Sequence, residues 1–239
     1  MNNIICIAGP TASGKTALAV ELAKEYNGEV VSCDSMQVYK RMDIGTAKPT
    51  AEEMAGIPHH MIDIVDPEED FSVARYVDMA AACVDDILAR GKLPILVGGT
   101  GLYLDALLRG GLAKEAETDE AYRKELSALA AEKGNEYVHS LLAAVDPESA
   151  AATHPNNLKR VIRALEIYRV CGIPKSELDK QTASVDGIYE PLAAGLFYDD
   201  RQALYDRIDR RVDIMLEEGL LDEVRELMNE GLFERSVTA

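Results

Sequence analysis

The octapeptide GPTASGKT, residues 9–16, is the feature that most constrains the fold of this 239-residue chain. It matches G-x-x-x-x-G-K-[ST], which holds phosphate groups when it follows a strand and opens a helix. The apolar stretch 4–8 precedes it, and a helical pattern with Leu18, Leu22 and Tyr26 follows it. We therefore predict a polyphosphate site made of Gly9, Pro10, Thr11, Ala12, Ser13, Gly14, Lys15 and Thr16.

Two residues of this phosphate loop, defined here as residues 9–16, have distinct expected roles. Backbone N–H groups and the partial positive charge of the helix N-terminus attract the anion. Lys15 should reach terminal phosphate oxygens, and the Thr16 hydroxyl should help to ligate Mg²⁺. We therefore expect Mg²⁺ as a cofactor, with Thr16 as its protein ligand.

The remaining strand and helix patterns indicate an α/β fold. Short apolar stretches at 29–33 and 93–97 read as strands of a parallel sheet, with helical patterns between them. From about residue 115 the chain is rich in helix formers for about 70 residues, and a strand pattern returns at 192–198. We predict a P-loop-type parallel sheet flanked by helices, with an inserted all-helical lobe. The expected ranges are 1–114 and 191–239 for the core and 115–190 for the lobe, with the core apparently truncated at its C-terminus.

The composition excludes several classes of protein. Apolar residues make up 47% of the chain, as in globular proteins. The net charge of -17 argues against general affinity for nucleic acid, so RNA binding would require a local basic face. Neither a signal-peptide pattern nor an apolar run of membrane-spanning length is present, and the four cysteines lack the spacing of a zinc site. We expect a cytoplasmic protein without a membrane partner.

The strand that should hold a metal-binding acid in a nucleotide hydrolase or kinase ends differently here. Its sequence, LPILVGGTGLY, ends in Gly98, Gly99, Thr100 and Gly101, without a carboxylate. Glycines at such a strand end let another molecule approach the backbone, and Thr100 offers a hydroxyl near the phosphate loop. A tight strand-to-helix turn without a catalytic role is the alternative.

An acid follows the second predicted strand. Asp34 lies just past residues 29–33, at the sheet edge where open α/β proteins bind ligands. Its carboxylate could take a proton from an attacking amine, and Gln37 could read the edge of a base. The alternative is a helix-capping Asp followed by a solvated turn. His59 and His60 are adjacent and lack partners at ligand spacing, so we expect a structural or substrate-lining role for them.

Six motifs together resemble one family. GPTASGKT, DSMQVY, IGTAKP, PHHMID, VGGTGLY and RALE occur in this order over essentially the whole chain. The chain thus resembles the tRNA dimethylallyltransferases, also called tRNA isopentenylpyrophosphate transferases. The resemblance implies transfer of the dimethylallyl group of dimethylallyl diphosphate to N6 of the adenosine 3′ of the anticodon (position 37), with release of diphosphate. The phosphate loop would then hold a leaving group, which explains why a γ-phosphate acid is missing.

The resemblance also implies roles for individual residues. Asp34 falls on the family's general base, and Thr100 falls near the diphosphate and the reacting carbon. Arg201, Arg207 and Arg211 align with the family pattern, and Arg207 and Arg211, four residues apart on one helix face, are suited to a diphosphate. Pairing with Asp206, Asp209 and Asp213 on a solvated helix is the alternative.

The partners implied are the anticodon stem-loop of tRNA and dimethylallyl diphosphate, and we expect a monomer. The stretch 156–175 holds five basic residues and one acidic residue, which supplies the basic face that RNA requires. The predicted tRNA-binding residues are Asp34, Ser35, Met36, Gln37, Arg123, Lys159, Arg160, Val161, Ile162 and Arg163. We expect the helical lobe to hold the anticodon stem while the core takes the base.

Three other interpretations stay open. A small-molecule or nucleotide kinase would use the same loop with ATP, but the VGGTGLY strand argues against it. An isopentenyltransferase acting on free adenine nucleotides would not need the long helical insertion. A non-catalytic RNA-binding module would not need Asp34 beside a phosphate loop. Members of the family continue further than this chain, with a Gly-Tyr motif and more helices, so the resemblance implies a C-terminally short chain.

Overall fold

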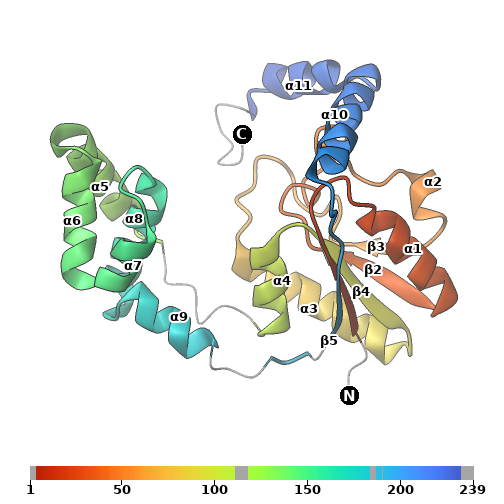
Figure 1. The fold of residues 1–239 in the computed structure, drawn as a ribbon, viewed down its shortest axis with the longest axis horizontal. Helices are drawn as coiled ribbons and strands as arrows, with labels where there is room; N and C mark the ends of the chain where they lie inside the picture. The colour runs from red at the N-terminus through yellow and green to blue at the C-terminus, as the bar shows by residue number, and fades with distance from the viewer. Residues whose placement is uncertain (1–3, 111–117, 184–186, 190, 233–239) are drawn as a thin grey trace. The chain divides into compact units, whose positions relative to one another are not determined.

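The computed structural model describes residues 4–110, 118–183, 187–189 and 191–232 (Figure 1). The chain divides into two compact units, one formed by Met1–Gly111 with Gly187–Ala239 and the other by Leu112–Asp186. The predicted boundaries at 114/115 and at 190 lie outside the described residues. In the described part, no helix is long and apolar enough to cross a membrane.

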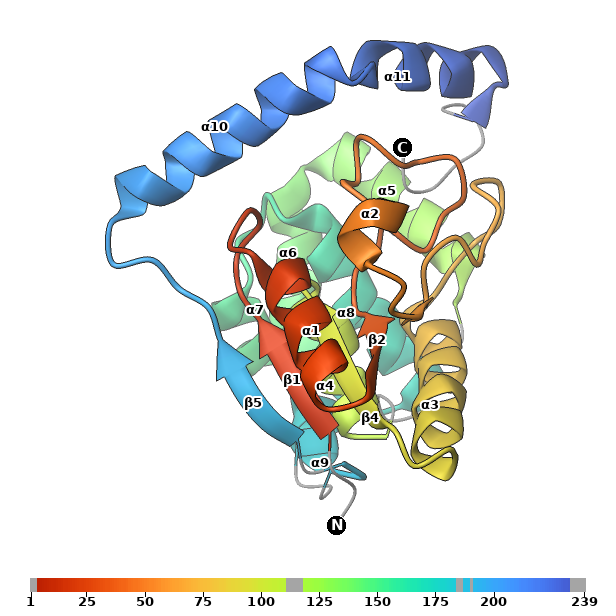
Figure 2. The same cartoon turned by 90° about the vertical axis from the view of Figure 1, so that its right-hand side faces the viewer.

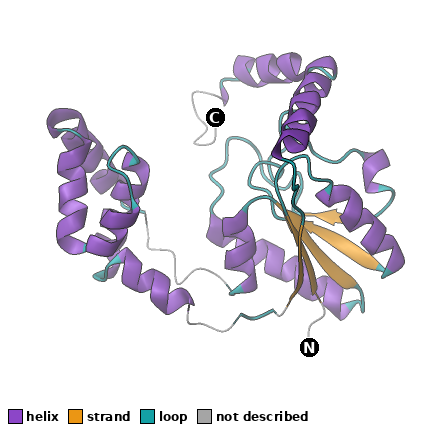
Figure 3. Cartoon of the chain, in the orientation of Figure 1, coloured by secondary structure: helices purple, strands orange, loops and turns teal. Residues whose placement is uncertain are grey.

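The first unit contains a parallel sheet, drawn in orange in Figure 3. The strands lie in the order β3-β2-β4-β1-β5. The five strands are Ile4–Ala8 (β1), Gly28–Ser32 (β2), His59–His60 (β3), Leu93–Gly98 (β4) and Pro191–Gly195 (β5). β1, β2 and β4 are the continuous apolar stretches, because both of their faces are covered. The fourth predicted strand, 192–198, ends three residues earlier than expected, as the largely exposed edge strand β5.

Helices cover both faces of this sheet. Apolar side chains of α1 pack on Ile7, Val30 and Ile95, while α3 and α4 lie on the opposite face (Figure 2). Tyr26, which shares the spacing of Leu18 and Leu22, ends α1 as an exposed residue. The helices of this unit are α1 (Lys15–Glu25), α2 (Ala51–Met54), α3 (Val73–Ala89), α4 (Gly101–Leu108), α10 (Arg201–Glu217) and α11 (Leu220–Asn229).

The second unit is helical throughout its described residues. Its elements are α5 (Glu120–Lys133), α6 (Asn135–Val145), α7 (Pro147–Ala152), α8 (Leu158–Cys171) and α9 (Lys175–Ala183). Leu126 of α5, Leu142 of α6 and Val161 and Leu165 of α8 form its core. The unit therefore has an apolar core of its own, and the predicted fold class is confirmed.

A buried carboxylate joins β2 to β3 and to the segment between α3 and β4 in the first unit. The Glu29 side chain in β2 is 3% exposed, and the Arg90 guanidinium contacts both of its oxygens. Lys92 Nζ lies 2.7 Å from Oε1, and His60 Nε2 of β3 lies 2.8 Å from Oε2. Arg90 first, then Lys92 and His60, hold the pKa of Glu29 far below its usual range, against the opposing effect of burial. This cluster fixes the edge of the sheet from β3 to the start of β4.

Replacing Glu29 by Gln should lower the free energy of unfolding by about 3–5 kcal/mol at pH 7, because the positively charged partners then lose the buried carboxylate that neutralises them. Urea titration followed by circular dichroism measures the change. The exposed Glu68→Gln should stay within about 0.5 kcal/mol of wild type.

The effect of this substitution should depend on pH in one direction. The pKa of Glu29 is depressed in the folded state, so its contribution is complete above the unfolded pKa of about 4.3 and declines as pH falls toward the folded pKa. The gap between wild type and Glu29→Gln should therefore narrow below about pH 4. A gap that stays constant down to pH 3 would contradict this assignment.

Candidate active site

A cavity of about 1020 Å³ lies at the carboxyl ends of the strands in the first unit. The phosphate loop and Asp34 line one part of it, the stretch 43–50 lines another, and α10 contributes Arg207, Arg210, Arg211, Ile214 and Met215. Open α/β sheets bind ligands at this edge, where successive parallel strands deliver their loops.

The phosphate loop turns sharply between β1 and α1. Ala12 and Gly14 have φ values of 58° and 87°, which curl the backbone before the helix begins. Gly9 has no room for a side chain, because a Cβ there would lie 2.8 Å from the carbonyl oxygen of Leu196, just after β5. The neighbouring edge strand therefore constrains where the loop starts.

Lys15 directs its ammonium group along the phosphate loop. Nζ donates to the carbonyl oxygens of Gly9 and Pro10 at 2.9 and 2.6 Å. Burial and then the positive charge of Arg211 lower the pKa of Lys15, while Asp34 acts in the opposite direction. Ser13 Oγ is buried and has no hydrogen-bond partner among the described residues. The loop thus combines concentrated positive charge with an unsatisfied hydroxyl, which suits an anion.

Two arginines of α10 lie over the phosphate loop. Arg207 Nε donates to the carbonyl oxygen of Ala12 at 2.9 Å, and Arg211 Nη1 donates to Thr11 Oγ1 at 3.0 Å. Within the described residues neither guanidinium is paired with a carboxylate. The two arginines thus contact the phosphate loop and do not pair with Asp206, Asp209 or Asp213. Arg201 lies instead 5.7 Å from the ring of Tyr205.

Asp34 caps its own turn and also lines the cavity. Its Oδ1 accepts from the backbone N–H groups of Met36 at 2.9 Å and Gln37 at 3.3 Å. Oδ1 therefore has the capping role that was the alternative to catalysis. Oδ2 accepts no hydrogen bond within the described part of the chain, so the carboxylate retains an oxygen for a further partner.

Thr100 contacts the Asp34 turn, defined here as residues 34–37. Its Oγ1 accepts from the backbone N–H of Ser35 at 3.1 Å and lies 3.5 Å from Ser35 Oγ. Residues 98 and 99 line the cavity, whereas Thr100, Ser35 and Met36 are not among its lining residues. Thr100 thus joins the ends of β2 and β4, and its predicted catalytic role stays a prediction.

Gln37 uses its amide group within the protein. Nε2 donates to the carbonyl oxygens of Thr46 and Ala47 at 3.2 and 3.0 Å, and Oε1 accepts from Ser32 Oγ at 3.2 Å. The donors thus hold the loop at residues 46–47 and the acceptor binds Ser32 of β2, while Gln37 also lines the cavity. Its role in reading the edge of a base stays a prediction.

The two glycines at the end of β4 differ in the space around them, and only Gly98 departs from the prediction that another molecule approaches the backbone there. A Cβ at Gly98 would lie 2.0 Å from the carbonyl oxygen of Cys33, whereas nothing lies closer than 3.9 Å to a Cβ at Gly99. Gly98 therefore allows β2 and β4 to approach each other, and only Gly99 leaves space on the cavity side.

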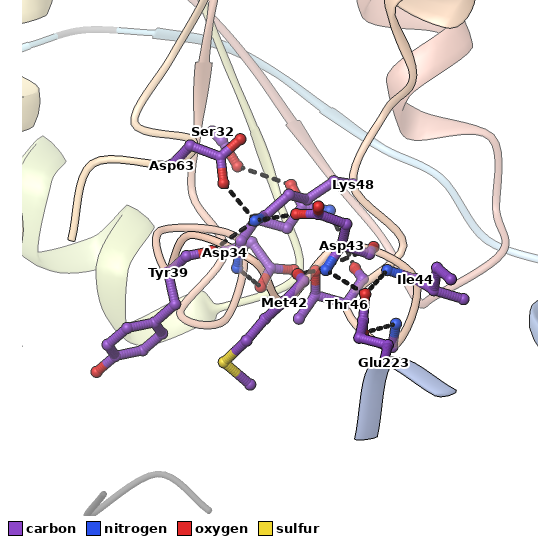
Figure 4. A network of polar contacts seen from close by, with 12 residues as sticks. Ser32, Asp34, Tyr39, Met42, Asp43, Ile44, Thr46, Lys48, Asp63 and Glu223 are labelled. Atoms are coloured by element: carbon purple, nitrogen blue, oxygen red, sulfur yellow. Dashed lines mark hydrogen bonds and ion pairs between the residues drawn. The ribbon is translucent and has the colours of Figure 1, made fainter. Parts of the chain in front are cut away.

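Sequence reasoning missed the polar network beneath the stretch 43–48 (Figure 4). The Lys48 side chain is 6% exposed, and Nζ bonds to the Tyr39 carbonyl oxygen and to the carboxylates of Asp43 and Asp63. A lone lysine in a polar loop gives no periodic signal from which its burial could be predicted.

The adjacent histidines have different partners. His60 binds Glu29, while His59 lines the cavity and donates from Nδ1 to the carbonyl oxygen of Ile57. Burial lowers the pKa of His59, which favours the neutral imidazole.

The second unit carries the other predicted site residues. Lys159 and Arg160 are exposed on α8, whereas Arg123 and Arg163 both bind Glu166, which is 0% exposed. Burial raises the pKa of Glu166, but the two guanidinium groups and the Asp119 N–H lower it further, so that the net shift is downward. Glu166 therefore holds both arginines in fixed positions at the surface.

Two members of the predicted tRNA-binding set belong to the core of this unit. Val161 and Ile162 are 0% and 7% exposed and pack among the apolar side chains of α5 and α6. Their inclusion is corrected accordingly: the 3–4 spacing of α8 directs them inward, so that on this helix Lys159, Arg160 and Arg163 remain as predicted RNA-binding side chains.

One predicted metal ligand lines the cavity. Thr16 presents a hydroxyl there, and no cluster of three His, Cys, Asp or Glu residues occurs among the described residues. This small donor set fits Mg²⁺, which keeps several waters and takes most of its other ligands from a bound phosphate group.

Comparisons with known proteins agree on one family. The family described as IPP transferase matches residues 37–239. A tRNA dimethylallyltransferase of Geobacillus thermodenitrificans is 53% identical over 230 residues, which are 96% of this chain and 72% of that protein. The crystal structure of a tRNA isopentenylpyrophosphate transferase from Bacillus halodurans is 48% identical, with a TM-score of 0.67 over 100% of this chain and 74% of that chain. Crystal structures of a eukaryotic dimethylallyltransferase acting on tRNA are 36% identical, with a TM-score of 0.80 over 96% of this chain and 56% of that chain.

Gly98→Ala should lower the free energy of unfolding by about 3 kcal/mol, because the added methyl group overlaps the Cys33 carbonyl. Gly99→Ala adds the same methyl group into open space and should change stability by less than about 1 kcal/mol. The test compares the urea midpoints of the two variants. Equal midpoints would show that the approach of β2 and β4 does not require a glycine at residue 98.

Proposed function

The chain belongs to the IPP transferase family and transfers a dimethylallyl group to tRNA, and on this premise we propose that the donor is dimethylallyl diphosphate and the acceptor is N6 of the adenosine 3′ of the anticodon. One observation carries the proposal. A phosphate loop with convergent cations and a carboxylate with an available oxygen line the same cavity. An anionic leaving group and an amine that loses a proton need these two features together.

The cations of the phosphate loop act on the leaving group. As the bond between the allylic carbon and the diphosphate oxygen breaks, negative charge grows on that oxygen. Lys15, Arg207 and Arg211 lie where they stabilise this charge, and Ser13 Oγ supplies a hydroxyl that the protein leaves unsatisfied. The strand β4 ends at Gly98 without a carboxylate, so the residues present suit departure of diphosphate better than transfer of a γ-phosphate.

Thr16 and the diphosphate would hold Mg²⁺, which when bound neutralises part of the leaving group's charge. The chain itself supplies orientation, because Thr16 is fixed in the first turn of α1 beside Lys15. The Mg²⁺ requirement is part of the proposal, and removal of divalent ions by a chelator tests it.

Asp34 acts on the attacking amine. The N6 nitrogen forms a bond to the allylic carbon, the carbon–oxygen bond to diphosphate breaks, and the N6 proton passes to Asp34. An exocyclic adenine amine is a weak nucleophile, so a hydrogen bond that strengthens as charge develops on nitrogen lowers the barrier. Oδ1 stays bound to the turn, which leaves Oδ2 as the proton acceptor.

The basic face of α8 serves the tRNA. Lys159 and Arg160 are exposed, and Glu166 fixes Arg123 and Arg163 through charged hydrogen bonds. Arginines held in this way lose less side-chain freedom when they meet a phosphate. The expectations of a monomer and of a cytoplasmic location stay predictions.

The assignment is tested by incubating the full-length protein with unmodified tRNA, dimethylallyl diphosphate and Mg²⁺, followed by nucleoside analysis. N6-dimethylallyladenosine should appear at one position beside the anticodon. Hydrolysis of ATP without a prenylated nucleoside would favour the kinase interpretation, and prenylation of free adenine nucleotides in place of tRNA would favour the second one.

Asp34→Asn separates the two roles of this residue. Asn keeps an oxygen for the N–H groups of Met36 and Gln37 but cannot take the proton, so kcat should fall by about 10²–10⁴-fold with little change in the affinity for either substrate. Asp34→Ala loses the cap as well and should also weaken substrate binding. Single-turnover rates and KM values are the measurements; an unchanged kcat in Asp34→Asn would restrict Asp34 to the capping role.

Lys159→Ala combined with Arg160→Ala should weaken tRNA binding and reduce the slope of log K against log salt by about 2, one unit for each lost phosphate contact. Lys24→Ala removes an exposed charge from α1 and should leave the slope unchanged. Binding measured from 50 to 200 mM salt gives the slopes. Equal slopes in all three proteins would place the RNA contacts elsewhere.

A further inference from the structure

The carboxylate of Glu223 on α11 fills a cradle of three successive backbone N–H groups (Figure 4). Oε2 accepts from Asp43 at 2.8 Å and from Ile44 at 2.7 Å, and Oε1 accepts from Gly45 at 2.9 Å. Successive N–H groups that converge in this way form a strong site for an anion. Both oxygens of Glu223 are therefore engaged with the stretch 43–45.

The surrounding residues make room for this contact. A Cβ at Gly45 would lie 3.2 Å from Leu220 Cδ1 and 3.4 Å from Glu223 Oε1, so a side chain there would press on α11. Gly219, with φ of 104°, makes the turn that ends α10 and starts α11 beside Ile44. A second carboxylate of the same region, Glu230, pairs with Arg41. The first turn of α11 therefore packs against the stretch 43–45.

On its other side the same loop is tied to the Asp34 turn. Gln37 donates to the carbonyl oxygens of Thr46 and Ala47, and its own N–H donates to Asp34 Oδ1. Hydrogen bonds therefore run from α11 through the stretch 43–47 to the carboxylate proposed as the base.

Helix α10, which precedes α11, depends on such polar contacts for its position. None of its residues is buried, although burial of an apolar face normally supplies most of the stability of a helix in a protein. Figure 2 shows α10 following the end of β5 and leading into α11, so that the two helices form one arm. Along this arm, Arg207 and Arg211 contact the phosphate loop and Glu223 contacts the amides of 43–45.

We propose that Glu223 is a positioning residue for the reaction: by binding the amides of residues 43–45 it keeps Arg207 and Arg211 over the phosphate loop and in register with the Asp34 turn. This inference rests on the proposed function, because it takes the two arginines as diphosphate ligands. Glu223 acts through them and does not itself touch the donor.

Glu223→Gln tests the inference with little change in shape. The amide of Gln keeps one acceptor oxygen but turns an N–H₂ group toward backbone N–H groups, so the cradle loses its anion. The Kd for inorganic diphosphate, measured by calorimetry in the presence of Mg²⁺, should rise about 10-fold, a size typical of coupling between groups in one network. The KM for dimethylallyl diphosphate should rise similarly, while the KM for tRNA should change less than about 3-fold.

Glu226→Gln is the matched control. Glu226 is exposed, lies three residues further along α11 and has no side-chain partner among the described residues. Its variant should bind diphosphate as the wild type does. Hydrogen exchange of the amides of 43–45 should accelerate in Glu223→Gln and not in Glu226→Gln; unchanged exchange in both would overturn the inference, because the contact would then not exist in solution.

A double-mutant cycle separates positioning from general damage to the fold. In a background with Arg207→Gln and Arg211→Gln, adding Glu223→Gln should weaken diphosphate binding by less than about 2-fold, because the groups through which it acts are gone. A full 10-fold effect in that background would overturn the inference, as would wild-type diphosphate binding in Glu223→Gln alone. Diphosphate binding and hydrogen exchange do not require prenyl transfer. A failure of the proposed function therefore appears separately, as a wild-type protein that forms no N6-dimethylallyladenosine.

Discussion

Parallel pairing of β1 with β4 and of β4 with β2 is the constraint on which the whole site depends, because it delivers three loops to one edge of the sheet. The phosphate loop follows β1, the Asp34 turn follows β2, and the glycine turn follows β4. The approach of Gly98 to the Cys33 carbonyl and the bond from Ser35 N–H to Thr100 lock two of these loops together. A shift of one residue in this register would turn buried side chains such as Ile95 from the α1 face to the opposite face of the sheet and displace the loops from one another.

The strongly acidic composition is compatible with an RNA substrate because several carboxylates are used inside the protein. Glu29 neutralises Arg90 and Lys92, Glu166 is shared by Arg123 and Arg163, and Glu223 binds backbone amides. Positive charge is left concentrated at the phosphate loop and on α8. For this chain the distribution of charge, and not its total, therefore decides what can bind.

The sequence predicted the elements whose signal is local. The strands β1, β2 and β4 are continuous apolar runs, and the phosphate loop has a fixed spacing, so both were predicted close to their observed bounds. The two-residue strand β3 was missed, because two histidines give no alternation to detect. The amide contacts of Gln37, the close approach at Gly98 and the pairing of Glu223 with residues 43–45 join positions far apart in the chain or lie in irregular loops. Such contacts depend on tertiary packing, which no local pattern records.

The absence of buried residues from α10 has a consequence for how this enzyme family can diversify. Ile214 and Met215 line the cavity from a helix that contributes nothing to the core. Substitutions at these two positions can therefore change the shape of the cavity at little cost in stability, because no buried side chain of this helix has to adjust. This wall of the cavity can thus vary in sequence while the phosphate loop and the Asp34 turn stay unchanged.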